Sequence, residues 1–115
     1  MKTEITPEKE QFILLRYPNI GIATQAIYDT LGITLEQMRS QDQTWAIALA
    51  RYMLFSVCPE VPTVAIGPFV NRSQALVSKR RADLYNKLKN DEGFNNMFEK
   101  VSNRYKQLKN VQQLS

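Results

Sequence analysis

The chain has 115 residues, 43% hydrophobic and 23% charged, with a formal net charge of +4, so it can form one domain with a core. It contains no histidine, one cysteine and four scattered glycines, which argues against a histidine base, an internal disulfide and a glycine-rich phosphate loop. No apolar run approaches the ~20 residues that cross a bilayer, and the opening MKTEITPEKE is unlike a secretory leader. We therefore expect a cytoplasmic protein that is not an enzyme and needs no metal or cofactor.

Two helices are predicted in the first third of the chain. Thr6 is a typical N-cap and Pro7 suits the first helical position, which predicts a helix over about 7–16. A second helix is predicted over 19–31, with Gly32 as its C-cap.

The middle of the chain should hold a short helical turn and then the most buried helix. Thr34 and Gln37 have the spacing of a capping box. The segment 44–57 is apolar nearly all round, which is typical of a central helix. Trp45 either fills the core, which we favour, or is exposed as an interaction anchor. Cys58 follows an apolar stretch and is expected to be a buried, inert thiol.

A short and a long helix are predicted next. The short helix should begin at Pro62 and close at Gly67-Pro68. Asn71 or Ser73 then caps a helix over about 71–89.

A last helix should end near Leu108, with the tail NVQQLS fraying. Because no segment alternates β-branched and polar residues over the length of a strand, no sheet is expected. Residues 1–115 are thus predicted to form a single all-α domain of five to six helices.

Residues 62–89 have the layout of a helix-turn-helix, with a short helix, a glycine-containing turn and a longer helix. At the start of the second helix, Arg72, Ser73 and Gln74 have side chains that can contact base edges in a major groove. Lys79, Arg80 and Arg81 follow, where they could reach the phosphate backbone. The same pattern also fits an ordinary helical hairpin whose basic side chains are hydrated.

The charge distribution favours a polyanionic partner for the C-terminal part of the chain. Residues 1–70 contain five basic and seven acidic residues, whereas residues 71–115 contain ten basic and four acidic residues. The net charges are therefore −2 and +6, and the positive charge begins at the predicted turn.

Three segments in order, IYDTLGITLEQMRS, WAIALARYMLF and AIGPFVNRSQALVSKRRADL, resemble the C-terminal DNA-binding domain of the bacterial replication initiator DnaA. That domain belongs to the Trp-repressor-like helix-turn-helix group. The resemblance covers about 19–108 and leaves 7–16 as an additional N-terminal helix. In the family this domain recognises short duplex sites in the replication origin, so the resemblance implies DNA binding in replication or transcription regulation. The family's ATPase module is absent from the sequence.

The resemblance assigns roles to individual residues, and two departures stand out. Arg72 matches the signature arginine, and the next three residues match those that contact bases and backbone, although Ser73-Gln74 replaces the family's Asp-His. The family's basic loop is here SQDQTW, with one acid and no base; Arg39 is its remnant, and Arg51 is a retained helix arginine. The predicted DNA-binding residues are Arg39, Arg51, Arg72, Ser73, Gln74, Ala75, Lys79, Arg80 and Arg81.

The leading prediction is a non-catalytic, duplex-DNA-binding helix-turn-helix domain, acting alone, as a homodimer or with a partner protein. The alternative is a protein-interaction adaptor on the same fold that has lost DNA binding. The neutralised loop, Trp45 and the apolar residues Phe94, Met97 and Phe98 of the last helix support the alternative.

Overall fold

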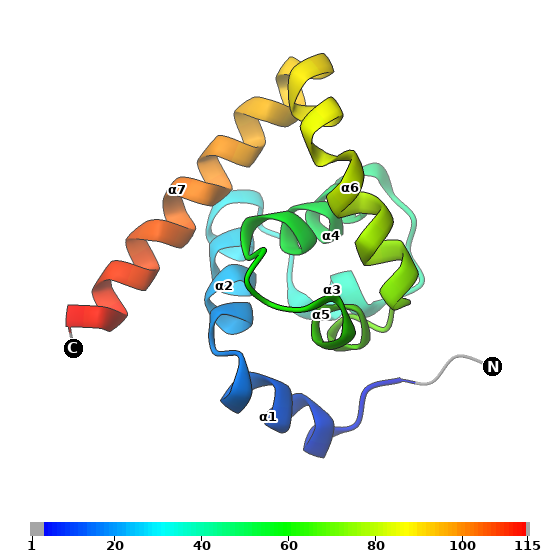
Figure 1. Cartoon of the computed structure of the whole chain (residues 1–115), viewed down its shortest axis with the longest axis vertical. Helices are drawn as coiled ribbons and strands as arrows, with labels where there is room; N and C mark the ends of the chain where they lie inside the picture. Colours follow the sequence, from blue (N-terminus) through cyan, green and yellow to red (C-terminus); the bar gives the residue numbers. More distant parts are fainter. Residues whose placement is uncertain (1–3, 115) are drawn as a thin grey trace.

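The computed structural model describes residues 4–114 and contains, within that range, seven helices and no strand (Figure 1). This confirms the all-α prediction and corrects the expected number of helices upward. The helices are α1 (Pro7–Arg16), α2 (Asn19–Leu31), α3 (Leu35–Arg39), α4 (Trp45–Val57), α5 (Thr63–Phe69), α6 (Gln74–Asn90) and α7 (Glu92–Leu114).

Three helix ends in the first third of the chain form where the local sequence predicts them. The Thr6 hydroxyl accepts a hydrogen bond from Lys9 N at 3.2 Å, with Pro7 as the first residue of α1. Gly32 closes α2 in the left-handed conformation (φ 72°), and Thr34 forms the expected reciprocal capping box at the start of α3.

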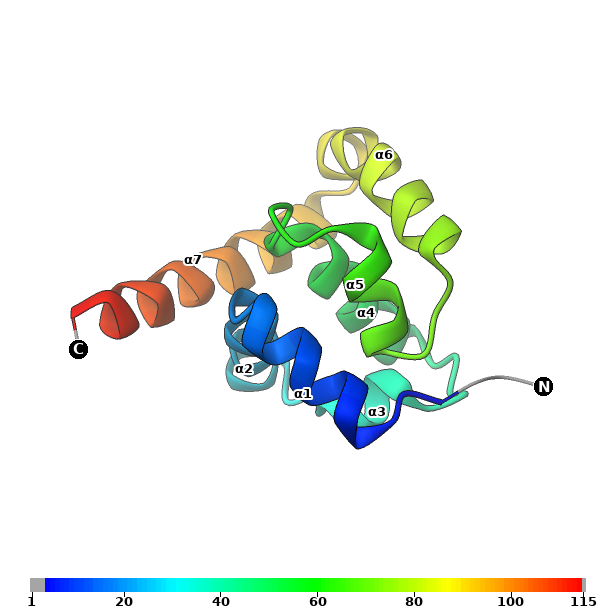
Figure 2. The ribbon, with the colours of Figure 1, turned by 60° about the horizontal axis from the view of Figure 1, so that its bottom comes forward.

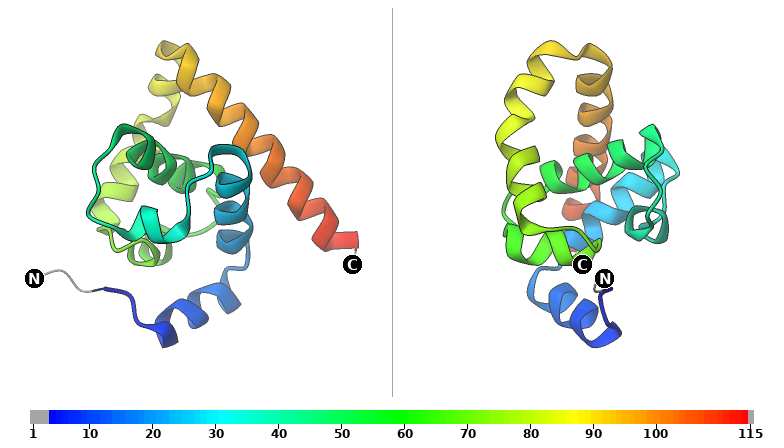
Figure 3. Two further views of the ribbon diagram at one scale, coloured as in Figure 1. Left: turned by 180° about the vertical axis from the view of Figure 1, so that it is seen from behind. Right: turned by 90° about the vertical axis from the view of Figure 1, so that its right-hand side faces the viewer.

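Helix α4 is the centre of the domain, as its uniformly apolar sequence predicts. Ten of its thirteen residues are buried, and α2, α5, α6 and α7 all pack against it. Helix α7 lies along α2, while α6 and α7 meet at a corner and diverge from it (Figures 1 and 3). Helix α1 packs against α2 and α5 at the opposite end (Figure 2). The core therefore holds α6 on one side of α4 and leaves the other side of α6 open.

Cys58, at the end of α4, is fully buried, which confirms the prediction of an inert thiol. Burial, together with the nearby Glu60 carboxylate, raises the thiol pKa to about 12. The thiol is therefore protonated at physiological pH and unreactive.

Three predictions are wrong in detail. Trp45 does not fill the core: it is the first residue of α4 and is 72% exposed. Helix α5 does not close at Gly67-Pro68 but continues to Phe69, with Pro68 accommodated in the last turn. Helix α7 extends to Leu114 rather than ending near Leu108. None of the helices described is long and apolar enough to span a bilayer.

Candidate nucleic-acid interface

The connection between α5 and α6 consists of residues 70–73, which fold back onto α5. The backbone N–H groups of Val70 and Arg72 both donate to the Gly67 carbonyl, at 3.1 and 2.9 Å. A Cβ on Gly67 would lie 3.0 Å from the Arg72 carbonyl oxygen, closer than a side chain normally approaches backbone. Glycine is favoured here because the turn packs directly on the helix backbone.

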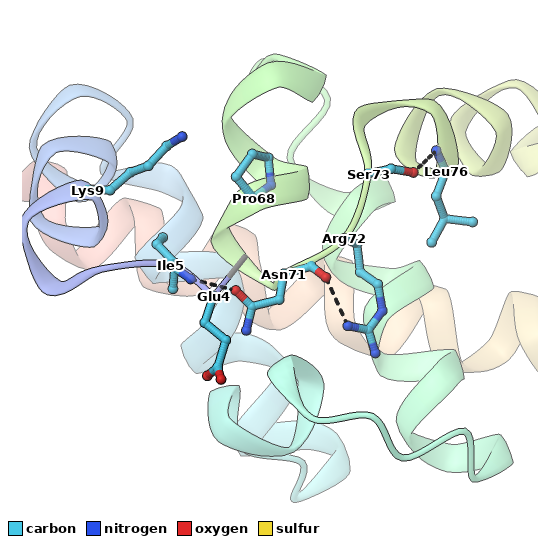
Figure 4. A pocket seen from close by; sticks show the side chains of 8 residues that line it. All are labelled: Glu4, Ile5, Lys9, Pro68, Asn71, Arg72, Ser73 and Leu76. Carbon is cyan, nitrogen blue, oxygen red and sulfur yellow. Dashed lines mark hydrogen bonds between the residues drawn. The ribbon is translucent and has the colours of Figure 1, made fainter. Parts of the chain in front are cut away.

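Asn71 ties this turn to two distant segments, and Figure 4 shows the first of these contacts, with Ile5. Its backbone is in the left-handed region (φ 58°), which asparagine tolerates better than most residues. Its Oδ1 accepts a hydrogen bond from Ile5 N at 2.8 Å, and its amide donates to the Arg39 carbonyl at 3.4 Å. The turn is therefore fixed against both the N-terminal segment and α3.

Ser73 is the N-cap of α6, one of the two alternatives predicted. Its hydroxyl accepts a hydrogen bond from Leu76 N at 3.1 Å (Figure 4). Gln74 and Ala75 follow with both residues exposed. The first turn of α6 thus presents Gln74 and Ala75 to solvent, with Ser73 occupied as the cap.

Arg51 and Arg72 hold the loop of residues 40–44. Arg51 is only 4% exposed and donates to the carbonyls of Met38, Ser40 and Asp42 at 2.7–2.8 Å. Arg72 donates to the Ser40 carbonyl at 2.6 Å and to two carbonyls of its own turn. Burial lowers the pKa of Arg51, and the nearby Arg72 charge lowers it further. Both guanidinium groups nevertheless stay protonated at neutral pH.

Arg39 and Arg81 also bind carbonyls inside the domain. Arg39 Nε donates to the Phe69 carbonyl at 2.7 Å, and its Nη1 lies 2.6 Å from the Glu10 carboxylate. Arg81 Nε donates to the Phe55 carbonyl at 2.7 Å and Nη2 to the Cys58 carbonyl at 3.2 Å. These bonds satisfy carbonyls that the ends of α4 and α5 leave without helical partners.

Lys79 and Arg80 differ from these four arginines. Lys79 is exposed and Arg80 half-buried, and neither makes a hydrogen bond or ion pair within residues 4–114. The Arg80 guanidinium lies 5.7 Å from the centre of the Tyr52 ring. Of the six basic residues predicted as DNA contacts, these two are the ones that make no hydrogen bond or ion pair to a described residue.

The open side of α6 is a stripe of residues three or four positions apart. Each member is exposed, and none is acidic; the members are Ala75, Ser78, Lys79, Ala82, Asn86 and Lys89. Two of these residues, Ala75 and Lys79, were predicted from the sequence as DNA-binding residues. The other four were not, although their helical spacing from Ala75 places them on the same face. Asp83 lies beside the stripe, toward α4.

The structure therefore divides the nine predicted residues into two groups. Gln74, Ala75 and Lys79 are exposed on α6, with Ser73 at its end, and the half-buried Arg80 lies toward Tyr52 of α4. The other four (Arg39, Arg51, Arg72 and Arg81) contact the backbone of neighbouring elements.

Comparison with known protein families, curated proteins and solved structures finds no match to this chain. In the part of the chain that the structure describes, no group of three or more histidine, cysteine or acidic side chains is placed to hold a metal ion. What the domain does is inferred from its own side chains.

Proposed function

We propose that the chain is a non-catalytic, duplex-DNA-binding domain in which α5, the turn of residues 70–73 and α6 act as a helix-turn-helix. This is the unit of the DnaA-like, Trp-repressor-like group that the sequence resembles. The observation that carries the proposal is the open stripe of α6, which combines small and polar side chains with lysines and has no carboxylate. Such a helix face can approach the floor of a major groove closely without repelling the phosphates.

The residues of the first turn of α6 and of its open stripe have separate roles. Gln74 is suited to the two hydrogen-bonding positions on adenine, and Ser78 to either a base or a phosphate. Lys79 and Lys89 lie on the same stripe and would contact phosphates on the two sides of the groove. Few phosphates are neutralised by such a surface, so a single domain should bind weakly and depend on a second copy or a partner for tight binding.

The inward-facing arginines support the proposed surface from behind. Arg72, the residue that matches the family's signature arginine, joins the turn to the loop of residues 40–44 through the Ser40 carbonyl. Its role in the proposal is to orient the first turn of α6 rather than to read a base. Arg51 has the corresponding role on the α4 side of the loop.

A protein-interaction adaptor is the second candidate, and one observation favours it. Phe12 and Leu15, three residues apart on α1, are 63% and 77% exposed. Adjacent exposed apolar side chains of this size are typical of contact surfaces. They lie on α1 and not on the open stripe of α6, so the two candidate functions use different surfaces.

The test is fluorescence anisotropy of a labelled random-sequence duplex over a series of salt concentrations. Binding should weaken steeply with salt, and Lys79→Gln should weaken binding to all sequences. Lys106→Gln, which removes the same charge from an exposed position of α7, is the matched control and should have little effect. Gln74→Ala should change sequence preference by ~1–3 kcal/mol at one position of a selected site. No binding at the lowest salt would refute the proposal and direct attention to Phe12 and Leu15.

A further inference from the structure

We propose that the groove between α4 and α6 binds one nucleotide, with the phosphate held by arginines at one end and the base stacked on Trp45 at the other. Two adjoining hollows form this groove, and they share Ala48, Tyr52 and Arg80.

The first end is rich in arginine. A hollow of about 260 Å³ is lined by Arg51, Arg72 and Arg80, together with Gln43, and no carboxylate lines it. Asp42, near Arg51, is the acid whose charge acts on this end, so the three guanidinium groups around the hollow keep an excess of positive charge that suits an anion.

Donors remain available at this end after the internal hydrogen bonds are made. The carbonyls of residues 38–42 occupy Nε and Nη2 of Arg51, and its Nη1 has no partner among the described residues. Arg72 uses both terminal nitrogens and leaves Nε. Arg80 makes no hydrogen bond to any described residue, so all five of its N–H groups are available. Arg51 and Arg72 are thus pre-positioned, while Arg80 is able to close on a ligand.

The second end is aromatic. A hollow of about 240 Å³ is lined by Trp45, Leu49, Asp83 and Lys87 in addition to the shared residues. The exposed indole of Trp45 offers a flat stacking surface beside the apolar side chains of α4. Asp83, whose Oδ2 accepts only a long hydrogen bond of 3.4 Å from Tyr52, is an acceptor for the exocyclic amine of a base.

A nucleotide fits this combination better than an acidic peptide does. Guanidinium groups bind a phosphate through paired N–H donors, and an indole stacks on a base but gains little from a carboxylate side chain. The net charge of +6 on residues 71–115 favours an anion over a neutral ligand. The shared chemistry is a phosphate with an attached planar base, and its source is either a free nucleotide or an unpaired nucleotide in DNA.

The DNA source rests on the proposed function, because Arg80 and Asp83, which line this groove, directly follow Lys79 and Ala82 of the duplex-facing stripe of α6. In that case the protein would prefer a duplex that carries one unpaired nucleotide over the same duplex fully paired. The free-nucleotide source does not depend on the open stripe of α6.

Trp45 is the sole tryptophan, so its fluorescence reports the site directly. We expect dAMP to quench it saturably, and deoxyadenosine, which lacks the phosphate, to bind at least about tenfold more weakly. Arg80→Gln should weaken dAMP binding by about tenfold to 100-fold, the range for losing charge-assisted hydrogen bonds. Lys106→Gln, which removes the same charge from an exposed position of α7 outside the groove, should leave dAMP binding unchanged.

The second arm compares a hairpin duplex with one unpaired adenine and its fully paired counterpart, with binding measured by calorimetry. Trp45→Ala should remove the preference for the unpaired nucleotide, which we expect to be about 5-fold to 100-fold, as for the loss of one base–aromatic stack. Because Trp45 is exposed, its removal should not unfold the domain, and circular dichroism checks this.

Saturable quenching by dAMP supports the site with a free nucleotide as its ligand. Preference for the duplex with an unpaired adenine supports the site with DNA as its source. No quenching by dAMP together with no preference for the unpaired nucleotide overturns the inference. Quenching by polyglutamate as strong as by dAMP also overturns it, because the groove would then be a general anion surface. If these results accompany salt-dependent binding of the paired duplex, the proposed function survives without the nucleotide site. If the paired duplex does not bind while dAMP binds saturably, the nucleotide site survives and the proposed function fails.

Discussion

The two sides of α6 carry basic residues with different tasks. On the side that faces the preceding turn and α4, Arg81 donates to backbone carbonyls, as Arg72 does from that turn and Arg39 and Arg51 do from neighbouring helices. On the open side, Lys79 and Lys89 are exposed and small residues separate them. The formal charge of the region therefore overstates the number of N–H donors that are available to a ligand, although every guanidinium still contributes to the positive field.

The comparison also shows why arginine occupies the inner side and lysine the outer. A guanidinium has five donors in a fixed plane and can join several carbonyls from different segments, as Arg51 does. An ammonium on a flexible stem is better hydrated and suits a surface that meets a phosphate only on binding. Four predictions, in order of decreasing effect, test this division.

The largest effect is expected at Arg51. Arg51→Met should lower the free energy of unfolding by at least about 3 kcal/mol, because the carbonyls of Met38 and Asp42 lose their side-chain donor and that of Ser40 keeps only Arg72. Urea denaturation followed by circular dichroism measures the change. Lys100→Met, at an exposed position of α7, is the control and should stay within ~0.5 kcal/mol of the parent. A loss below about 1 kcal/mol at Arg51 would show that these bonds contribute little to the fold.

Gly67 tests how tightly the turn packs on α5. Gly67→Ala should destabilise the domain by about 1–3 kcal/mol, since the new Cβ would meet the Arg72 carbonyl oxygen at 3.0 Å and the Ser73 backbone at 3.2 Å. Gly93→Ala is the matched control: its Cβ would lie 3.6 Å from the nearest atom, within α7, where alanine is the better helix former. The control should be neutral or stabilising by up to ~1 kcal/mol. Equal stability of the two variants would contradict the close approach.

These structural residues illustrate what the sequence could and could not predict. The caps at Thr6, Gly32 and Thr34 were predictable because each depends on bonds or dihedral angles within four residues. The inward roles of Arg51 and Arg72 were not, because the sequence does not show whether a guanidinium meets a phosphate or a carbonyl that folding has brought near. The stripe of α6 lies between these cases: its period is local, but which side faces solvent depends on the packing against α4.

A pair of charge-matched substitutions separates the two sides of α6 directly. Arg81→Gln should lower stability by about 1–2 kcal/mol, because the Phe55 and Cys58 carbonyls lose a charged donor. It should leave the salt dependence of DNA binding unchanged. Lys79→Gln should leave stability within ~0.5 kcal/mol and reduce the salt slope by about 0.9, the value for one phosphate contact.

Denaturation and salt titration of both variants give four values to compare. The division of roles would fail if Arg81→Gln reduced the salt slope while Lys79→Gln left it unchanged. A third substitution, Lys106→Gln, gives the baseline for losing one positive charge from an exposed position of α7.

The smallest effect on stability is expected at Trp45, where a large aromatic residue would ordinarily matter most. Burying a tryptophan contributes several kcal/mol, so a core position would lose about 3–5 kcal/mol on truncation to alanine. At 72% exposure Trp45 makes little of that contribution, and Trp45→Ala should change the free energy of unfolding by less than ~0.5 kcal/mol. Leu54→Ala, in the fully buried part of the same helix, gives the contrast and should cost about 2–5 kcal/mol. An exposed tryptophan that adds no stability yet lines a groove with three arginines nearby is better explained by what it binds than by how the chain folds.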